Sequence, residues 1–318
     1  MAAEPSSKIA VIAALIGNVL VAITKAIAAA LTGSSSMLSE AVHSLVDTVN
    51  EVLLLYGMRR AAQRADAYHP FGYGRELYFW SFVVALLIFA LGAGVSIFEG
   101  IGHVRQPEPV TDPYINYIVL GLAFLFEGGS WLVSLRQFRA AKGDLGWFEA
   151  FRRSKDPPSF MVLFEDSAAL IGIVLAALGT YGSASLGLPV LDGVASILIG
   201  VVLAVTSMLL ARESKSLLVG ERADRGLADA IVQIASTAPG VEAANGVVTT
   251  QMGPNQIVAA LSIDFADAVS ARDVETIIED IERRVRAQWP EVISLFVKPQ
   301  SRAAYEAALS RHYCGAAS

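Results

Sequence analysis

Residues 37–58 read MLSEAVHSLVDTVNEVLLLYGM, an apolar run that also carries a regular polar pattern. About 20 residues of helix are enough to cross the roughly 30 Å hydrocarbon core of a bilayer. Polar side chains three or four residues apart lie on one face of a helix. Residues 37–58 therefore predict a membrane helix whose single polar face carries Glu40, His43, Asp47 and the adjacent pair Asn50 and Glu51.

Five other runs have a similar length and are continuously apolar, which favours helices over membrane strands. These runs are residues 9–31, 77–101, 114–135, 160–178 and 190–210. Of 318 residues, 54% are hydrophobic and only 17% are charged, and the mean hydropathy is +0.52. A soluble domain carries about 25% charged residues. The expected fold class is therefore membrane all-α, with six transmembrane helices in a lipid bilayer.

Basic residues gather in the loop after residue 58 and the loop after residue 135, whereas the opposite loops carry only Arg105. Loops rich in Lys and Arg stay in the cytoplasm, so both termini are expected there. The 18 arginines against 6 lysines fit a GC-rich bacterial genome, which makes a bacterial inner (cell) membrane the expected location. The net charge of -6 argues against nucleic acid as a partner.

From about Glu221 the chain becomes charged and loses its long apolar runs. The pattern predicts a helix over 225–238, strands over 241–252 and 256–265, a helix from Ser270 to about 288, and a strand over 292–297. This αββαβ order describes a cytoplasmic, ferredoxin-like α+β domain. We therefore divide the chain into a transmembrane transport domain (1–217), a dimerisation domain (218–300) and a C-terminal tail (301–318).

Placing an ionisable side chain inside a membrane span costs free energy, so such residues are candidates for functional sites. His43 and Asp47 lie one turn apart, so an imidazole nitrogen and a carboxylate oxygen can converge on one ion. Zinc accepts both kinds of ligand. The alternative is a buried hydrogen-bonded pair that holds two helices together. Inside a span we favour metal or proton binding.

Other spans carry ionisable residues as well. Glu165 and Asp166 are neighbours, so they point about 100° apart on a helix and cannot face one ion equally. We favour Asp166, and Glu165 is a second ligand, a proton carrier or an interfacial group. Glu127 either contacts another helix or lies on the ion path. Lys25 is close enough to the end of its span to snorkel, and Asp192 sits where a helix N-terminus favours an acid.

Residues 36–47 (SMLSEAVHSLVD) and residues 69–76 (HPFGYGRE), together with the six spans and the αββαβ order, resemble the cation diffusion facilitator family. The resemblance covers roughly residues 8–300. It implies a homodimeric exporter of a divalent metal, driven by proton antiport, with no enzymatic activity and no bound cofactor. It also implies metal ligands on the second and fifth helices, which His43, Asp47 and Asp166 match. The fourth family position falls at Val162, which cannot bind metal.

This departure implies three protein ligands completed by water or by Glu165, Glu127 or Asn18. The Glu-Asp pair resembles the subgroup that includes the ninth human zinc transporter, so zinc is the favoured cargo. Manganese, iron or cobalt export is an alternative. A different class of function is a membrane-bound metal sensor that transports no ion.

Some family members also bind metal in the loop between the second and third spans. Asp66 and His69 match that site, but Tyr73 stands where another histidine is expected, so a structural role is favoured. The two strands at which relatives bind zinc in the tail contain no histidine here, and a metal-bridged tail dimer is therefore not expected.

Overall fold

The computed structural model describes the backbone of residues 5–314 and the side chains of residues 18–140 and 142–311. The part of the first predicted span before residue 18 therefore has no described side chains. The chain forms two compact units. The helical unit contains Met1–Arg60 and Glu76–Lys215, and the tail unit contains Ala61–Arg75 and Ser216–Ser318.

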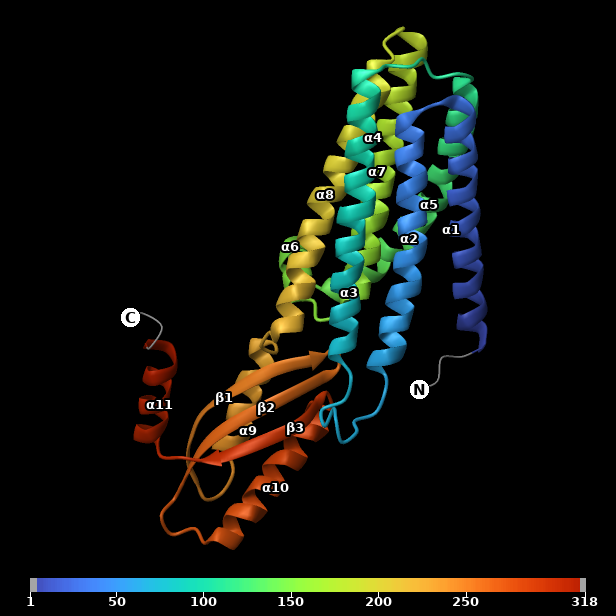
Figure 1. Cartoon of the computed structure of the whole chain (residues 1–318). Coiled ribbons are helices and arrows are strands. Elements are labelled where there is room, and N and C mark those ends of the chain that lie inside the picture. Colours follow the sequence, from blue (N-terminus) through green and yellow to red (C-terminus); the bar gives the residue numbers. More distant parts are fainter. Residues whose placement is uncertain (1–4, 315–318) are drawn as a thin grey trace. The chain divides into compact units, whose positions relative to one another are not determined.

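Long helices build the helical unit (Figure 1), and the short helix α6 (Trp147–Arg153) connects two of them. The π-helical turn η1 (Ile88–Ala93) joins α3 and α4 into one continuous rod. The long helices are α1 (Pro5–Thr32), α2 (Ser35–Ala61), α3 (Arg75–Leu87), α4 (Gly94–Arg105), α5 (Pro113–Lys142), α7 (Pro157–Ser185) and α8 (Val190–Val219).

Four predicted spans are confirmed, because the described residues include four helices long and apolar enough to cross a membrane. These are Arg75–Arg105, Pro113–Ala140, Pro157–Ser185 and Val190–Val219. The described part of α1, Asn18–Thr32, is apolar but shorter. Helix α2 is long and carries the polar face expected from its sequence. The chain is a multi-pass membrane protein of helical class with an attached α+β domain.

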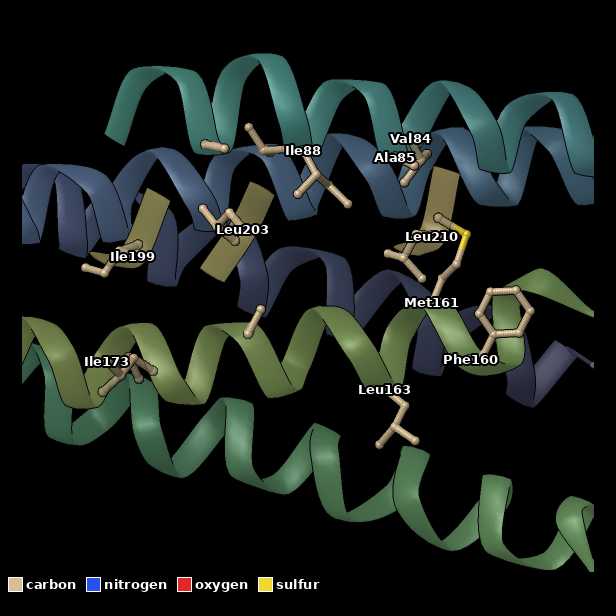
Figure 2. Packing of buried hydrophobic residues seen from close by; sticks show 14 of the residues in the cluster. Val84, Ala85, Ile88, Phe160, Met161, Leu163, Ile173, Ile199, Leu203 and Leu210 are labelled. Carbon is tan, nitrogen blue, oxygen red and sulfur yellow. The ribbon is translucent and has the colours of Figure 1, made fainter. Parts of the chain in front are cut away.

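Buried aliphatic and aromatic side chains form the core of the bundle (Figure 2). Ile199, Leu203 and Leu210 of α8 lie in the same cluster as Phe160 and Met161 of α7. Small residues bring α8 close to α4 as well. A Cβ on Gly100 would lie 2.7 Å from the carbonyl oxygen of Gly193, so only glycine permits this approach. Close contact through small residues is a common way to pack membrane helices.

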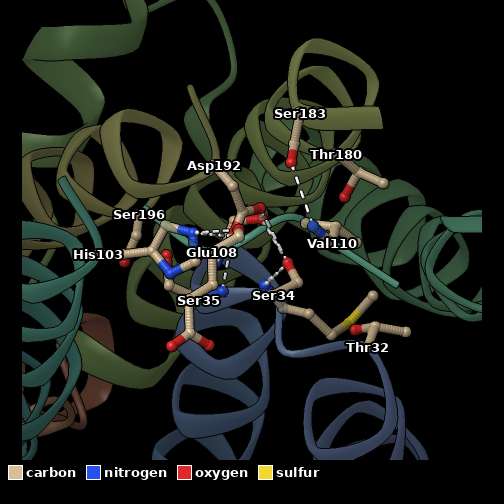
Figure 3. Close-up of polar contacts among 12 residues, drawn as sticks. Thr32, Ser34, Ser35, His103, Glu108, Val110, Thr180, Ser183, Asp192 and Ser196 are labelled. Atoms are coloured by element: carbon tan, nitrogen blue, oxygen red, sulfur yellow. Dashed lines mark hydrogen bonds and ion pairs between the residues drawn. The ribbon is translucent and has the colours of Figure 1, made fainter. Parts of the chain in front are cut away.

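The first turn of α2 is held by a carboxylate from α8 (Figure 3). Asp192 Oδ2 accepts hydrogen bonds from the backbone N–H groups of Ser35 (2.6 Å) and Ser36 (3.2 Å). Asp192 Oδ1 accepts from the hydroxyl of Ser34 at 2.8 Å. The first N–H groups of a helix have no partner within the helix and favour a negative charge. Asp192 thus stands at the start of its own helix, as expected, but its carboxylate caps a different one.

The tail unit contains a three-stranded sheet of order β1-β2-β3, in which β1 and β2 are antiparallel and β2 and β3 are parallel. Alternate residues of β2, such as Ile257 and Leu261, share one apolar cluster with Ile231 of α9 and Ile281 of α10. The elements are α9 (Arg225–Ser236), β1 (Val241–Gly253), β2 (Gln256–Phe265), α10 (Ala271–Gln288), β3 (Val292–Pro299) and α11 (Arg302–Cys314). The predicted αββαβ order is confirmed.

The loop that follows α2 belongs to the tail unit. The ring of Phe71 meets the ring of Phe296 edge to face, with 6.2 Å between their centroids. A Cβ on Gly74 would lie 2.5 Å from the carbonyl oxygen of Met252, so this glycine permits close backbone contact. The loop after α2 is therefore part of the tail unit, although the sequence-based boundary at residue 217 places this loop in the transport domain.

We predict that Asp192→Ala lowers the free energy of unfolding by about 3 kcal/mol, because it removes a charged acceptor from buried donors at the start of α2. Denaturant unfolding of the purified protein in mixed micelles measures the change. Asp144→Ala is the matched control, since Asp144 is exposed in the loop after α5. Equal stability of the two variants would contradict the role given to Asp192.

A second prediction concerns the capping box of α10, in which Ser270 Oγ accepts from the Asp273 backbone and Asp273 accepts from the Ser270 backbone. Ser270→Ala should destabilise α10 by about 1 kcal/mol, read from amide hydrogen exchange in the full-length protein. Thr276→Ala within the same helix is the control.

The hydrogen bonds from Ser270 hold the pKa of Asp273 below its ordinary value. The cap is therefore fully stabilising above the pKa of an unfolded Asp, about 3.9, and weakens as the pH falls through the lower folded pKa. Protection of α10 that stays constant through this acid range would contradict the assignment.

Candidate functional site

A cavity of about 230 Å³ lies inside the helical unit, between residues of α1, α2, α5 and α7. Five acidic side chains contribute to its wall, and none of the described residues that line it is basic. Concentrated acidic groups at membrane depth are costly unless they serve an ion or proton pathway. The polar lining residues are Asn18, Ser44, Asp47, Glu51, Glu127, Ser130, Glu165 and Asp166.

Helix α2 brings His43 and Asp47 together as the sequence predicts. His43 Nδ1 lies 3.3 Å from Asp47 Oδ1, and the His43 side chain is 1% exposed. Neither imidazole nitrogen has a hydrogen-bond partner, and neither does Asp47 Oδ1. Buried polar atoms are nearly always satisfied, so these three atoms are well suited to receive a ligand or a proton. His43 itself does not line the cavity, whereas Asp47 does.

Helix α7 places Glu165 and Asp166 on the wall of the same cavity. Glu165 Oε1 accepts a hydrogen bond from Asn50 Nδ2 of α2 at 3.2 Å. Asp166 Oδ2 accepts from the hydroxyl of Ser130 on α5 at 2.8 Å. The two neighbouring acids are thus oriented by different helices. Val162 also lines the cavity, which places an apolar side chain one turn before Asp166.

The acids surround the cavity without closing into a coordination shell. In the part of the chain with described side chains, no group of three or more His, Cys, Asp or Glu residues is arranged to hold a metal ion. Glu51 Oε2 accepts from Asn18 Nδ2 at 3.0 Å, which joins α1 to α2 at the cavity wall. A metal ion held here by three of these side chains would require them to move closer to one another.

The two candidates in the loop after α2 lie in the tail unit, and Asp66 is already engaged there. Its Oδ1 accepts from the backbone N–H groups of Tyr68 (2.9 Å) and His69 (2.7 Å). Its Oδ2 accepts from the Tyr73 hydroxyl at 2.7 Å. This last hydrogen bond is the main cause that lowers the pKa of the Asp66 carboxyl. The ring of His69 lies against the ring of Tyr73, 4.2 Å between centroids, so these contacts support a structural role.

Hydroxyl groups are the part of the site that sequence reasoning missed. Ser130 and Ser134 both donate toward Asp166, although the Ser134 contact is long at 3.5 Å. Ser44 lines the cavity from α2. The available signal was their spacing, because Ser130 and Ser134 lie one helical turn apart in the span that also carries Glu127.

The expectation that Lys25 snorkels to the membrane surface is wrong. Its side chain is 0% exposed, and its Nζ lies 3.0 Å from Glu40 Oε2. An acid on the facing helix makes pairing inside the bundle available, whereas snorkelling applies when the head group has no internal partner.

Comparison with known proteins gives a consistent result. Residues 11–219 match the family model described as the cation efflux transmembrane domain. The chain is 32% identical to a mitochondrial proton-coupled zinc antiporter of Xenopus laevis over 295 residues, which are 90% of this chain and 52% of that protein. The human protein of the same name is 29% identical over 275 residues, which are 84% of this chain and 48% of that protein.

A bacterial relative matches over nearly its whole length. The chain is 28% identical to the cation-efflux pump FieF of Cronobacter sakazakii over 290 residues, which are 89% of each protein. By contrast, the chain spans about half the length of the zinc antiporters that it matches.

Proposed function

This chain belongs to the cation efflux family, the cation diffusion facilitators that its motifs resemble, and we propose that it exports a divalent metal cation in exchange for protons. The observation that carries the proposal is the cavity lined by five acids next to His43. Zn²⁺ is the favoured cargo, because imidazole and carboxylate are both zinc ligands. The names of the zinc antiporters similar to this chain support the same cargo.

The proposed ligands are His43 and Asp47 of α2 together with Asp166 of α7, and Glu165 is the candidate for the fourth position. The unsatisfied atoms of His43 and Asp47 support the first pair. Asp166 is held by Ser130 at a position from which its second oxygen can accept an ion. The five acids exceed the two negative charges that balance a divalent ion, so the remaining acids are available to carry protons.

Proton exchange follows from competition for the same groups. A metal ion binds only deprotonated ligands, so its arrival releases protons and its departure allows them to return. The ion enters from the cytoplasm and leaves on the opposite side as the helices change their packing.

Basic loops on one side of the bundle support the proposed orientation, with both termini in the cytoplasm. We place the protein in the inner membrane of a bacterium, although two relatives are named as mitochondrial.

We also propose that the protein works as a homodimer joined through the domain at residues 218–300. The two strands that would carry metal ligands in some relatives are apolar here, at Leu261 in β2 and at Leu295 and Val297 in β3. Because these positions offer no metal ligand, we expect the dimer to form without a bridging metal.

We predict that His43→Ala and Asp47→Asn each reduce zinc flux to background, because each removes a ligand that no neighbour replaces. Uptake of Zn²⁺ into proteoliposomes under an imposed pH gradient measures the flux. Asp144→Asn, in an exposed loop, is the matched control. Flux at the wild-type level in either site variant would contradict the ligand assignment, and zinc binding without any flux in the wild-type protein would favour a sensor.

A separate prediction concerns the missing family ligand at Val162. Val162→His should tighten zinc binding by about tenfold, because it adds an imidazole to a cavity that already contains Asp166. Titration calorimetry of the purified protein measures the affinity. Val162→Leu is the control for size. If Val162→His leaves the affinity unchanged while Glu165→Gln abolishes binding, Glu165 rather than Asp166 is the ligand from α7.

A further inference from the structure

Lys25 is a fully buried cation inside the bundle, and it lies directly behind the acidic cavity. Its Nζ lies 3.0 Å from Glu40 Oε2 and donates a hydrogen bond to the Ser44 hydroxyl at 2.7 Å. The side chains of Lys25 and Glu40 are both 0% exposed. Unlike the exposed lysines of a surface, this ammonium cannot exchange its partners for water.

The contacts of Lys25 reach the cavity through two side chains. Ser44 and Glu127 both line the cavity, and the Glu127 Oε1 atom lies 4.0 Å from Lys25 Nζ. Glu127 is partly accessible, with 16% of its side chain exposed, whereas Lys25 is not. Glu127 is therefore an acid of the cavity wall whose Oε1 atom already faces the Lys25 ammonium.

Glu40 fixes the position of that charge. Its Oε2 is the oxygen paired with Lys25, and its Oε1 has no hydrogen-bond partner. A Cβ on Gly172 of α7 would collide with Glu40 Oε1, so the carboxylate fills the space that this glycine leaves. Glu40 is thus enclosed between Lys25 of α1 and Gly172 of α7.

We propose that Lys25 is an affinity-determining residue, a resident counter-cation that withholds Glu127 from the transported metal and weakens metal binding. The inference rests on the proposed function, because it assigns a role within the same cavity. An ion in the cavity experiences the ammonium as a like charge, and the interaction is only weakly screened in a buried environment. Weaker binding is useful to a transporter, since the ion has to leave the site as well as enter it.

A purely structural ion pair makes a different prediction from a counter-cation. If Lys25 and Glu40 only hold α1 against α2, removing either one leaves the other charge buried and destabilises the protein. Metal affinity would then be unchanged in both variants or lowered in both. If Lys25 sets the charge that the metal experiences, the two variants shift metal affinity in opposite directions.

The first experiment therefore measures zinc affinity and thermal stability for Lys25→Met and Glu40→Gln in full-length protein in lipid nanodiscs. Lys25→Met should lower the Kd for Zn²⁺ by about tenfold, because it removes one positive charge beside the cavity. Glu40→Gln should raise the Kd by a similar factor, because the ammonium then loses its partner and turns fully toward Glu127. Both variants should unfold at a lower temperature than wild type.

The second experiment avoids an unpaired buried charge. The double variant Lys25→Met/Glu40→Gln removes both charges together and should remain folded. In this background no ammonium faces Glu127, so its carboxylate is available to the metal. Adding Glu127→Gln should therefore raise the zinc Kd by about tenfold. In the wild-type background the same Glu127→Gln change should raise the Kd by a smaller factor, because Glu127 there already faces the Lys25 ammonium. This cycle measures the coupling between Lys25 and Glu127 directly.

Two outcomes would overturn the inference while leaving the proposed function intact. One is a shift of zinc Kd in the same direction in Lys25→Met and Glu40→Gln. The other is an equal effect of Glu127→Gln in both backgrounds. Wild-type protein that neither binds nor transports Zn²⁺ would instead overturn the proposed function, and this inference with it.

Discussion

Charged and polar groups on one helix, placed at membrane depth, are the constraint that organises the bundle. Helix α2 carries Glu40, His43, Asp47, Asn50 and Glu51 along its length, and lipid offers none of them a partner. Helices α1, α7 and α8 supply polar contacts to α2. The partners are Asn18 and Lys25 from α1, Glu165 from α7 and Asp192 from α8.

These contacts are distributed unevenly along α2: its first turn is held by several hydrogen bonds, whereas its middle contains polar atoms without hydrogen-bond partners. At its first turn, Asp192 is buried and accepts from several donors. Ser39 adds a hydroxyl contact of 2.6 Å to Ser196 of α8. One turn further along, His43 and Asp47 have atoms without hydrogen-bond partners. A helix held at one end and unsatisfied in its middle is suited to bind an ion and to shift its packing when it does so.

Single elements could be predicted from the sequence, whereas contacts between elements could not. The capping box of α10 needs only neighbouring residues, and helical spacing alone placed Val162 and Asp166 on one face of α7. Nothing in the spacing of α1 shows that Lys25 faces Glu40, because pairing across helices depends on how each helix is rotated in the bundle. The donors to Asp192 were missed for the same reason, since they lie 157 and 158 residues away in the sequence.

The balance of charge around the cavity sets how strongly a cation is attracted to it. Five acids without an internal cation would bind a divalent ion strongly but would repel one another when the cavity is empty. The buried Lys25 ammonium, which is shared between Glu40 and Glu127, eases that repulsion at Glu127 without occupying the place of the ion. Glu127 contacts this ammonium, while Asp47, Glu165 and Asp166 face the cavity from α2 and α7. The acids of the wall therefore divide into one, Glu127, that faces an ammonium shared with Glu40, and others that face the cavity from α2 and α7.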